Sequence, residues 1–449
     1  MPWLIAGAGA SARARSLERG DWERSGILVW YGADEILYTD SRHIPMRLAR
    51  FLVVFVFFLL PLSAWAGQAD AAQYKSFEVS GWIPYWRAAT GTADALAHID
   101  AFTEINPFVY TVKRDGTLVD NGKLKEEPWL SLRAEAKKKN IRFIPTITWG
   151  SGETIHAILS NTKARIALED RIADLVKKEG FDGIDIDFEG KKAATRTYFS
   201  TFLKGLYMRM GNKWVMCTIE ARTPLADRYF GTTPPKDATE FANDFKEINK
   251  YCDRVRIMAY DQQGIDLKLS DEATRISLLY APVSDPRWVE KALRLAMKDI
   301  SKRKIMIGIP TYGYEYNVTA YANPPDRPAG NEYVYDTLWT FNPGYAIPIA
   351  SSLGIAPQRS YWGEMFFTYI STNTSTPPLG EDISALRASA NASRDATAGN
   401  TNLTFRMMVW PDAESVREKV ELAKRLGVRG VSIFKIDGGE DPNIWSVLK

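Results

Sequence analysis

The sequence has 449 residues, of which 45% are hydrophobic and 25% are charged, a composition typical of a folded protein with a large core. Lys and Arg (57) nearly balance Asp and Glu (54) for a net charge of +3, too little for a protein that binds nucleic acid through its phosphates. Three histidines and two cysteines provide few zinc ligands and no disulfide framework. We therefore expect no metal and no cofactor.

Residues 46–66 have the three parts of a secretory signal peptide. A basic start precedes the apolar run FLVVFVFFLL at 51–60, and Ala-Trp-Ala at 64–66 supplies a cleavage site after Ala66. The apolar run is shorter than the roughly 20 residues of a membrane-spanning helix, so membrane attachment is expected only if the segment stays uncleaved. We expect a secreted, periplasmic or cell-envelope protein.

A signal peptide acts from the beginning of a chain, whereas this one follows 45 other residues. We therefore interpret residues 1–45 as an upstream reading-frame extension without a fold of its own. A cytoplasmic tail is the alternative.

From Ser80 onward, short apolar runs alternate with amphipathic helical patterns. Eight strand-then-helix units predict an α/β fold, a (β/α)8 TIM barrel with parallel strands. The strand candidates are 80–85, 105–111, 141–148, 181–189, 214–220, 254–260, 304–311 and 429–436. Helical periodicity is found at 164–179, 194–210, 237–250, 287–302 and 413–426.

The alternation breaks once, between the seventh strand and the helix at 413–426. This stretch is rich in Tyr, Pro, Asn, Ser and Thr, and it includes STNTSTPP at 371–378. A loop of this length in a compact domain is usually a functional insertion, so we expect a small α+β subdomain at about 317–405 that walls the mouth of the barrel. Four N-x-S/T sequons fall in it, at Asn317, Asn373, Asn391 and Asn402.

The fourth strand candidate carries acids at alternate positions. Asp185, Asp187 and Glu189 alternate with apolar residues, so the three acids share one face of the strand and point into the barrel. Neighbours on that face lie about 6 to 7 Å apart, and like charges so close in a partly dry interior must share at least one proton. Glu189 stands at the C-terminal end of its strand, where barrel enzymes place their chemistry. The pattern predicts a general acid.

Two other interpretations of the acids remain. A solvated acidic turn does not explain the apolar residues between them. A divalent metal site could use D-x-D-x-E oxygens, but no second cluster of oxygen ligands or His is evident at the other strand ends. Sensitivity to EDTA would identify the metal-dependent alternative.

With these motifs the sequence resembles glycoside hydrolase family 18, the family of chitinases and related N-acetylglucosaminidases. FDGIDIDFE at 181–189 matches the family signature D-G-x-D-x-D-x-E at every fixed position. The resemblance covers roughly 81–449 and is closest to the bacterial branch of spore-cortex-lytic glucosaminidases, so 76–449 would form the catalytic barrel. Further matching segments are INPFVYTV with RDGTL at 114–118, MAYD at 258–261, GIPTYGYEY at 308–316 and GVSIFKIDG at 430–438.

The resemblance implies retaining hydrolysis of β-1,4-linked N-acetylglucosamine glycans, chitin oligomers or peptidoglycan, assisted by the substrate's own acetamido group. Glu189 would be the acid and then the base, and Asp187 would orient and polarise the acetamido group. Asp185 would share a proton with Asp187. Tyr260 would donate a hydrogen bond to the acetamido oxygen, and Asp261 would bind the sugar or the Tyr260 loop.

Fourteen tryptophans suggest a stacking ligand such as a sugar ring, although core packing is the alternative. The family usually has a tryptophan beneath the −1 sugar on the eighth strand, whereas this chain has Phe434. A phenyl ring has less area and no N–H, so weaker binding at −1 is expected. Other candidate platforms at strand ends are Tyr85, Trp86, Trp149 and Tyr312.

Cys217 falls on the fifth strand and Cys252 at the start of the sixth, and we expect two buried thiols rather than a disulfide. The alternative function is a non-catalytic carbohydrate-binding protein on the same barrel. An intact Glu189 argues against it, while Phe434 argues for it. The expected partner is an N-acetylglucosamine-containing oligo- or polysaccharide, bound by a monomer.

Overall fold

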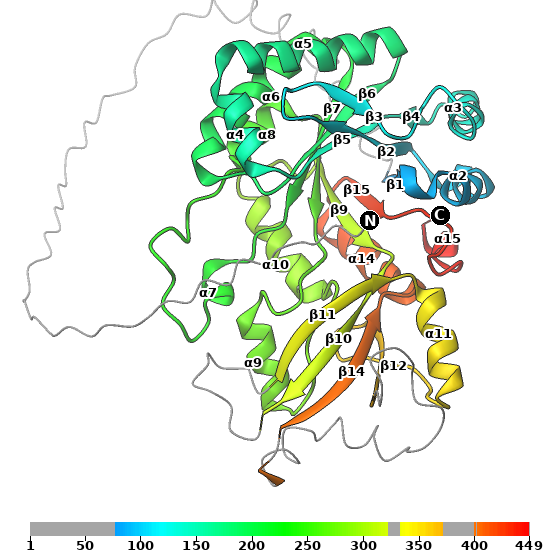
Figure 1. Ribbon diagram of the computed structural model, residues 1–449, viewed down its shortest axis with the longest axis vertical. Helices are drawn as coiled ribbons and strands as arrows, with labels where there is room; N and C mark the ends of the chain where they lie inside the picture. The colour runs from blue at the N-terminus through cyan, green and yellow to red at the C-terminus, as the bar shows by residue number, and fades with distance from the viewer. Residues whose placement is uncertain (1–76, 322–332, 371–398, 401, 449) are drawn as a thin grey trace, which may run out of the picture. The chain divides into compact units, whose positions relative to one another are not determined.

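The computed structural model of the chain describes residues 77–321, 333–370, 399–400 and 402–448. Eight parallel strands close into a barrel with helices packed around it (Figure 1), as predicted. In pairing order the barrel strands are β1 (Glu78–Pro84), β2 (Glu104–Val112), β5 (Thr146–Trp149), β6 (Gly183–Phe188), β7 (Trp214–Glu220), β8 (Arg254–Met258), β9 (Ile305–Pro310) and β15 (Gly430–Phe434), which pairs back with β1. Short strands β3 (Leu118–Asp120) and β4 (Arg142–Phe143) pair with β2.

The helices begin and end where the sequence supplies caps. In α5, the Asn161 side chain accepts a hydrogen bond from the Ala164 N–H, and the helix ends at Gly180 with a φ of 66°, a conformation that favours glycine. The helices of the barrel are α2 (Ala88–Ala97), α3 (Trp129–Lys138), α4 (Gly152–Ser160), α5 (Thr162–Glu179), α6 (Arg196–Met210), α7 (Leu225–Arg228), α8 (Phe245–Tyr251), α9 (Leu267–Arg275), α10 (Pro286–Ala296), α14 (Ala413–Leu426) and α15 (Ile444–Val447).

One helix is shorter than its pattern suggested. The periodicity at 237–250 predicted a helix throughout, but α8 begins only at Phe245. The Asp244 carboxylate accepts hydrogen bonds from the N–H groups of Lys246 and Glu247, at 3.1 and 3.3 Å, and so caps the helix there. Apart from α7, residues 221–243 form the loop that follows β7.

Side chains on β6 alternate between the helices and the barrel interior. Ile184, Ile186 and Phe188 are fully buried on the outer side, where the ring of Phe188 stacks on Phe202 of α6 at 5.4 Å between centroids. The acids between them point into the barrel, as the period of two predicted.

Ion pairs join the N-terminal ends of the barrel strands. Glu78 lies 2.7 Å from both Arg254 and Arg429 and 3.3 Å from Arg142. Burial by itself would raise the pKa of Glu78, but the hydrogen bond from Arg254 and the neighbouring cations lower it to about 2. Glu78 is therefore ionised at neutral pH. From β1 it pairs with residues on β4, on β8 and just before β15.

An insertion between β9 and α14 forms a second sheet and a helix, α11 (Pro343–Ser352). Its strands run antiparallel from Gly313 to Trp410, so they begin before and end after the expected range of 317–405. Asn373, Asn391 and the segment 371–378 lie outside the described residues. In order the strands are β11 (Tyr333–Phe341), β10 (Gly313–Ala320), β14 (Leu403–Trp410), β13 (Met365–Tyr369) and β12 (Gln358–Arg359).

The second sheet is anchored beside the loop that follows β8. Glu364 is fully buried, and its carboxylate accepts hydrogen bonds from the N–H groups of Val283 and Ser284 at 2.9 and 2.7 Å. Trp362 donates to the same carboxylate at 2.8 Å. These contacts join the insertion to the loop that follows β8. In the same region, Tyr312 and Tyr314 hydrogen-bond to Asp261, which lies just after β8.

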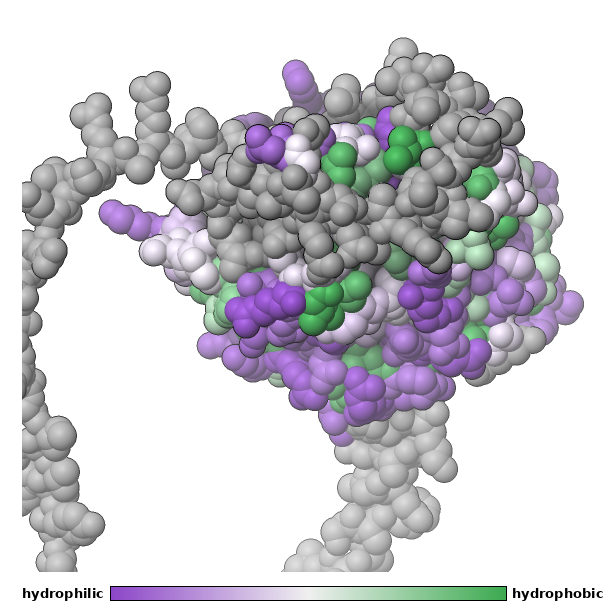
Figure 2. All heavy atoms as spheres, turned by 90° about the horizontal axis from the view of Figure 1, so that it is seen from below, coloured by the Kyte–Doolittle hydropathy of each residue, from purple (hydrophilic) through white to green (hydrophobic). Residues whose placement is uncertain are grey.

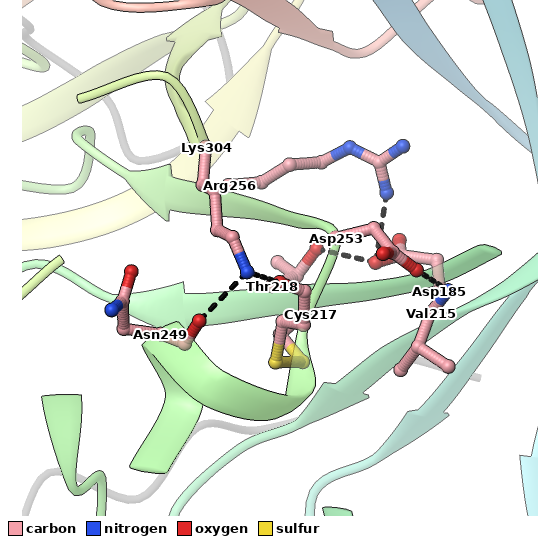
Figure 3. Close-up of a disulfide and its surroundings, with 9 residues drawn as sticks. Asp185, Val215, Cys217, Thr218, Asn249, Asp253, Arg256 and Lys304 are labelled. Carbon is pink, nitrogen blue, oxygen red and sulfur yellow. Dashed lines mark hydrogen bonds and ion pairs between the residues drawn. A yellow bond between two sulfur atoms is a disulfide. The ribbon is translucent and has the colours of Figure 1, made fainter. Parts of the chain in front are cut away.

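Cys217 and Cys252 form a disulfide (Figure 3), so the expectation of two free thiols is wrong. Cys217 lies on the helix-facing side of β7, and the end of α8 brings Cys252 to a Cα–Cα distance of 5.9 Å. Strand positions alone did not reveal this, because the contact depends on where α8 ends. Lys304 fixes that end by donating to the carbonyls of Asn249 and Cys252, at 2.7 and 2.9 Å.

We expect removal of this disulfide to destabilise the barrel. It joins residues 35 positions apart, and closing a loop of that size is worth about 3 to 4 kcal/mol through the unfolded chain. The double variant Cys217→Ala with Cys252→Ala should lose about that much free energy of unfolding in urea. Wild type unfolded with and without reductant is the control. Equal stability of the variant and the oxidised wild type would contradict the expectation.

Polar side chains predominate on one face of the described structure (Figure 2). On the face shown in Figure 2, the coloured residues are mostly hydrophilic, and hydrophobic ones occur between them as small areas. Large exposed apolar side chains are spread over several elements, such as Met208 on α6 and Ile347 on α11. Within the described part of the chain, no helix is long and apolar enough to cross a membrane.

Candidate active site

The three acids of the fourth barrel strand lie together at its C-terminal half. Asp185 and Asp187 are buried, at 0% and 3% exposure, whereas Glu189 is partly exposed just beyond the end of β6. The Glu189 N–H donates to the Trp149 carbonyl at 2.9 Å, which fixes its backbone against the end of β5. Glu189 is thus placed at the mouth of the barrel and the aspartates below it.

Asp185 is held by side chains from three other barrel strands, the two neighbours β5 and β7 and the more distant β1. Trp82 of β1, Thr146 of β5 and Thr218 of β7 donate hydrogen bonds to its oxygens at 3.0, 2.8 and 2.9 Å. Burial raises the pKa of Asp185 to about 6, and these three hydrogen bonds oppose the rise. The three donors together fix the orientation of the Asp185 carboxylate.

A buried cation lies beneath the ladder. Arg256 of β8 is fully buried, and its guanidinium lies 2.8 Å from Asp185 (Figure 3) and also pairs with Glu104. Burial lowers the pKa of Arg256 to about 9, so it stays charged at neutral pH. Its charge favours the ionised form of Asp185.

The two upper acids, Asp187 and Glu189, lie close enough to influence each other's ionisation. Burial, together with the charges of Glu189 and Asp185, raises the pKa of Asp187 well above its usual range. Burial and the charge of Glu220 raise the pKa of Glu189 as well. The pair therefore retains a proton at a pH where isolated carboxyls have lost theirs, which is what acid catalysis near neutral pH needs.

Tyr260 and Asp261 face this ladder from the end of β8. Burial and the four surrounding carboxylates hold the pKa of Tyr260 well above its usual range, so its hydroxyl is a hydrogen-bond donor. Asp261 has a φ of 57° and accepts hydrogen bonds from Tyr312 and, at 2.6 Å, from Tyr314. The insertion thus orients a carboxylate at the mouth of the barrel.

Phe434 lies within an aromatic cluster at the end of β15. Its ring stacks on Tyr260 at 5.6 Å and meets Trp82, Tyr312 and Phe108 edge-on at 5.8, 6.0 and 6.1 Å. Phe434 is partly exposed. It therefore offers a small apolar surface beside Tyr260, supported by four aromatic neighbours.

The other candidate platforms divide into two groups. Tyr85 and Trp86 are 36% and 53% exposed, and Trp86 meets Phe108 of the aromatic cluster edge-on at 5.9 Å, so both can offer a surface at the rim. Tyr312 is only 6% exposed, and its hydroxyl is engaged by Asp261.

The structure contradicts the expectation that Trp149 is a sugar platform. Trp149 is paired in register with Phe188, so it shares the helix-facing side of the sheet and meets that ring at 5.2 Å. It is 5% exposed, and its indole N–H donates to Thr154. Trp149 is a core residue.

Sequence reasoning missed the polar residues around the ladder. Thr146, Thr218 and Arg256 hold Asp185, while Lys191 and Glu220 lie beside Glu189 and form an ion pair at 3.6 Å. Glu220 is the last residue of β7, a position where barrel enzymes carry functional groups, so its place was available as a signal. Among the described residues, no group of three or more His, Cys, Asp and Glu side chains is arranged to hold a metal ion.

A closed barrel with a ladder of carboxyl groups at the C-terminal ends of its strands is the arrangement of a barrel enzyme, whose reacting groups lie at that end. The chain belongs to glycosyl hydrolases family 18, whose family model matches residues 74–439. It is a glycoside hydrolase.

The curated relatives have low sequence identity to this chain, but the matches extend over most of its length. An uncharacterized glycosylase, YvbX, of Bacillus subtilis is 24% identical over 372 residues, covering 80% of this chain and 89% of the relative. The cortical fragment-lytic enzyme of Bacillus cereus is 23% identical over 370 residues, covering 78% and 70%.

Solved structures share the fold. The spore cortex-lytic enzyme SleL of Bacillus cereus superposes with a TM-score of 0.58 at 19% identity, covering 83% of this chain and 73% of that one. A chitinase from Chromobacterium violaceum gives a TM-score of 0.59 at 17% identity, covering 83% and 98%.

Proposed function

We propose that the protein is a secreted, retaining hydrolase of β-1,4-linked N-acetylglucosamine glycans that uses the substrate's acetamido group as the nucleophile. The observation that carries the proposal is the ladder of Asp185, Asp187 and Glu189 facing Tyr260. It contains one proton donor, Glu189, and one carboxylate, Asp187, beside it for a developing positive charge. Family membership supports this reaction class.

Glu189 protonates the glycosidic oxygen and then accepts a proton from the attacking water. Asp187 binds the acetamido N–H and stabilises the cationic ring that forms when the acetamido oxygen attacks the anomeric carbon. Within the described structure, Asp187 Oδ1 is buried and accepts no hydrogen bond, so it is available for that N–H.

The remaining residues support these two. Tyr260 donates its hydroxyl to the acetamido oxygen and aims it at the anomeric carbon. Asp185, fixed by its three donors, takes part of the negative charge and lets Asp187 exchange a proton between its neighbours. Asp261 contacts the sugar at the mouth. Phe434 is the floor of the −1 site, a smaller one than tryptophan would make.

Chitin oligomers and peptidoglycan strands both fit this chemistry. The names of similar proteins include both chitinases and cortex-lytic enzymes, and both kinds of polymer contain N-acetylglucosamine. The open rim with Tyr85 and Trp86 suits an extended glycan.

Export rests on two separate features. The segment 46–66 has signal-peptide composition, although it lies outside the described residues. The disulfide between Cys217 and Cys252 is of a kind that persists in oxidising compartments. We propose that the monomer acts outside the cytoplasmic membrane, in the cell envelope or beyond it.

The test is release of a fluorogenic group from 4-methylumbelliferyl GlcNAc, chitobioside and chitotrioside by the chain from Gly67 onward, with and without EDTA. Cleavage of any of these substrates, unaffected by EDTA, supports the proposal, and the preferred length indicates endo or exo action. Cleavage of muropeptide glycans alone makes peptidoglycan the substrate. Sugar binding without cleavage of any substrate would contradict the proposal and favour a carbohydrate-binding protein.

A further inference from the structure

A lysine that the family signature does not include is buried next to the proposed acid. Lys191 follows Glu189 after a turn at Gly190, whose φ is 62°, and its side chain is only 1% exposed. Its ammonium donates to the carbonyl of Phe188 and lies 4.8 Å from the ring centroid of Phe199. A buried ammonium is costly unless it is paired, so its position needs an explanation.

The partner of Lys191 is Glu220 at the end of the adjacent strand, 3.6 Å away. Glu220 also accepts hydrogen bonds from the Gly190 N–H at 3.2 Å and from the Asn243 side chain at 2.6 Å. The pair therefore contacts the backbone on both sides of Glu189: Lys191 donates to the carbonyl of Phe188, and Glu220 accepts from the N–H of Gly190.

We propose that Lys191 is a positioning residue that acts through Glu189: with Glu220 it fixes the turn carrying the acid and holds a positive charge beside the carboxylate ladder. The proposal rests on the role proposed above for Glu189. Lys191 needs no contact with substrate for this role.

Glu189 is surrounded by several acidic groups and a cation, which act on its pKa in opposite directions. The groups that face it are Asp187 from β6, Glu220 from β7, Asp261 and Tyr260 from the end of β8, and Lys191 from its own turn. Lys191 is the only cation in this group. Its charge lowers the pKa of Glu189 and of Asp187, whereas the charge of Glu220 raises the pKa of Glu189. Removing the charge of Lys191 should therefore raise the pKa of Glu189, and removing the charge of Glu220 should lower it.

The experiment compares Lys191→Met with Glu220→Gln in the chain from Gly67 onward. Lys191→Met should lower kcat about 10- to 100-fold, as expected when a reacting group is misplaced, and move both limbs of the pH profile of kcat/KM up by about 1 pH unit. Glu220→Gln should move the limb set by Glu189 down. The Asn243 Oδ1 lacks a hydrogen-bond partner in the described structure, so this amide can flip to receive the new Gln side chain.

Lys192→Met is the matched control, because Lys192 is exposed and pairs with Glu153 at 2.5 Å. It should leave kcat and both limbs unchanged. A second readout needs no turnover: the pKa of Glu189, followed by ¹³C NMR of glutamate-labelled protein and assigned with Glu189→Gln, should rise in Lys191→Met and fall in Glu220→Gln. If Lys191→Met does not fold, the downward shift in Glu220→Gln decides.

Shifts in the same direction, or no shift, would overturn the proposal and leave Lys191 a purely structural residue. Opposite NMR shifts in a protein that cleaves no glycan would instead support the positioning role and refute the proposed function. An active enzyme whose Glu189 pKa does not move would refute the positioning role alone.

Discussion

Glu189→Gln is expected to lower kcat on N-acetylglucosamine glycans by about 10² to 10⁴-fold, the usual contribution of a general acid–base group, while sugar binding is retained. The substitution keeps the size of the side chain, but it removes the transferable proton. Glu189 is the only member of the ladder at the barrel mouth, so neither aspartate can replace it.

The loss should depend on the leaving group. A 4-methylumbelliferyl group departs with little protonation, whereas a sugar hydroxyl needs a full proton, so Glu189→Gln should be less damaging on the fluorogenic substrate than on chitotetraose. Steady-state kinetics on both substrates measure this difference. Glu153→Gln, a change on an exposed side chain of α4, is the control. Wild-type rates in Glu189→Gln on chitotetraose would refute the assignment of the acid.

Asp187→Asn is expected to cost about 10² to 10³-fold in kcat, the usual effect of removing one electrostatic stabiliser of a transition state. Asparagine fits the same space but brings no negative charge to the cationic ring, and its amide can present an N–H where the acetamido N–H must be accepted. Unlike the loss in Glu189→Gln, this loss should be equal for good and poor leaving groups. A leaving-group dependence like that of Glu189→Gln would contradict the role given to Asp187.

Strand periodicity was enough to predict the barrel and its acids. Alternation in FDGIDIDFE placed Asp185, Asp187 and Glu189 on the interior face, and the structure has them there. The same period of two explains why Trp149 is in the core, but only once the structure shows that Thr146 points inward to Asp185; Trp149, three residues later, then points outward.

Contacts between separate elements could not be predicted in this way. The disulfide depends on the end of α8 meeting β7, and α8 itself is shorter than its periodicity because Asp244 caps it. Nothing in the sequence distinguishes Lys191 from its neighbour Lys192. Only the folded turn shows that Lys191 is buried against Glu220 while Lys192 is exposed.

In the proposed reaction the substrate provides its own nucleophile. This can be measured as the rate of cleavage of chitotetraose compared with the same tetramer bearing a free amine instead of the acetamido group on the sugar in the −1 site. We expect cleavage of the fully acetylated tetramer and no detectable cleavage at the de-N-acetylated sugar. Similar rates for both, or cleavage of neither, would contradict it.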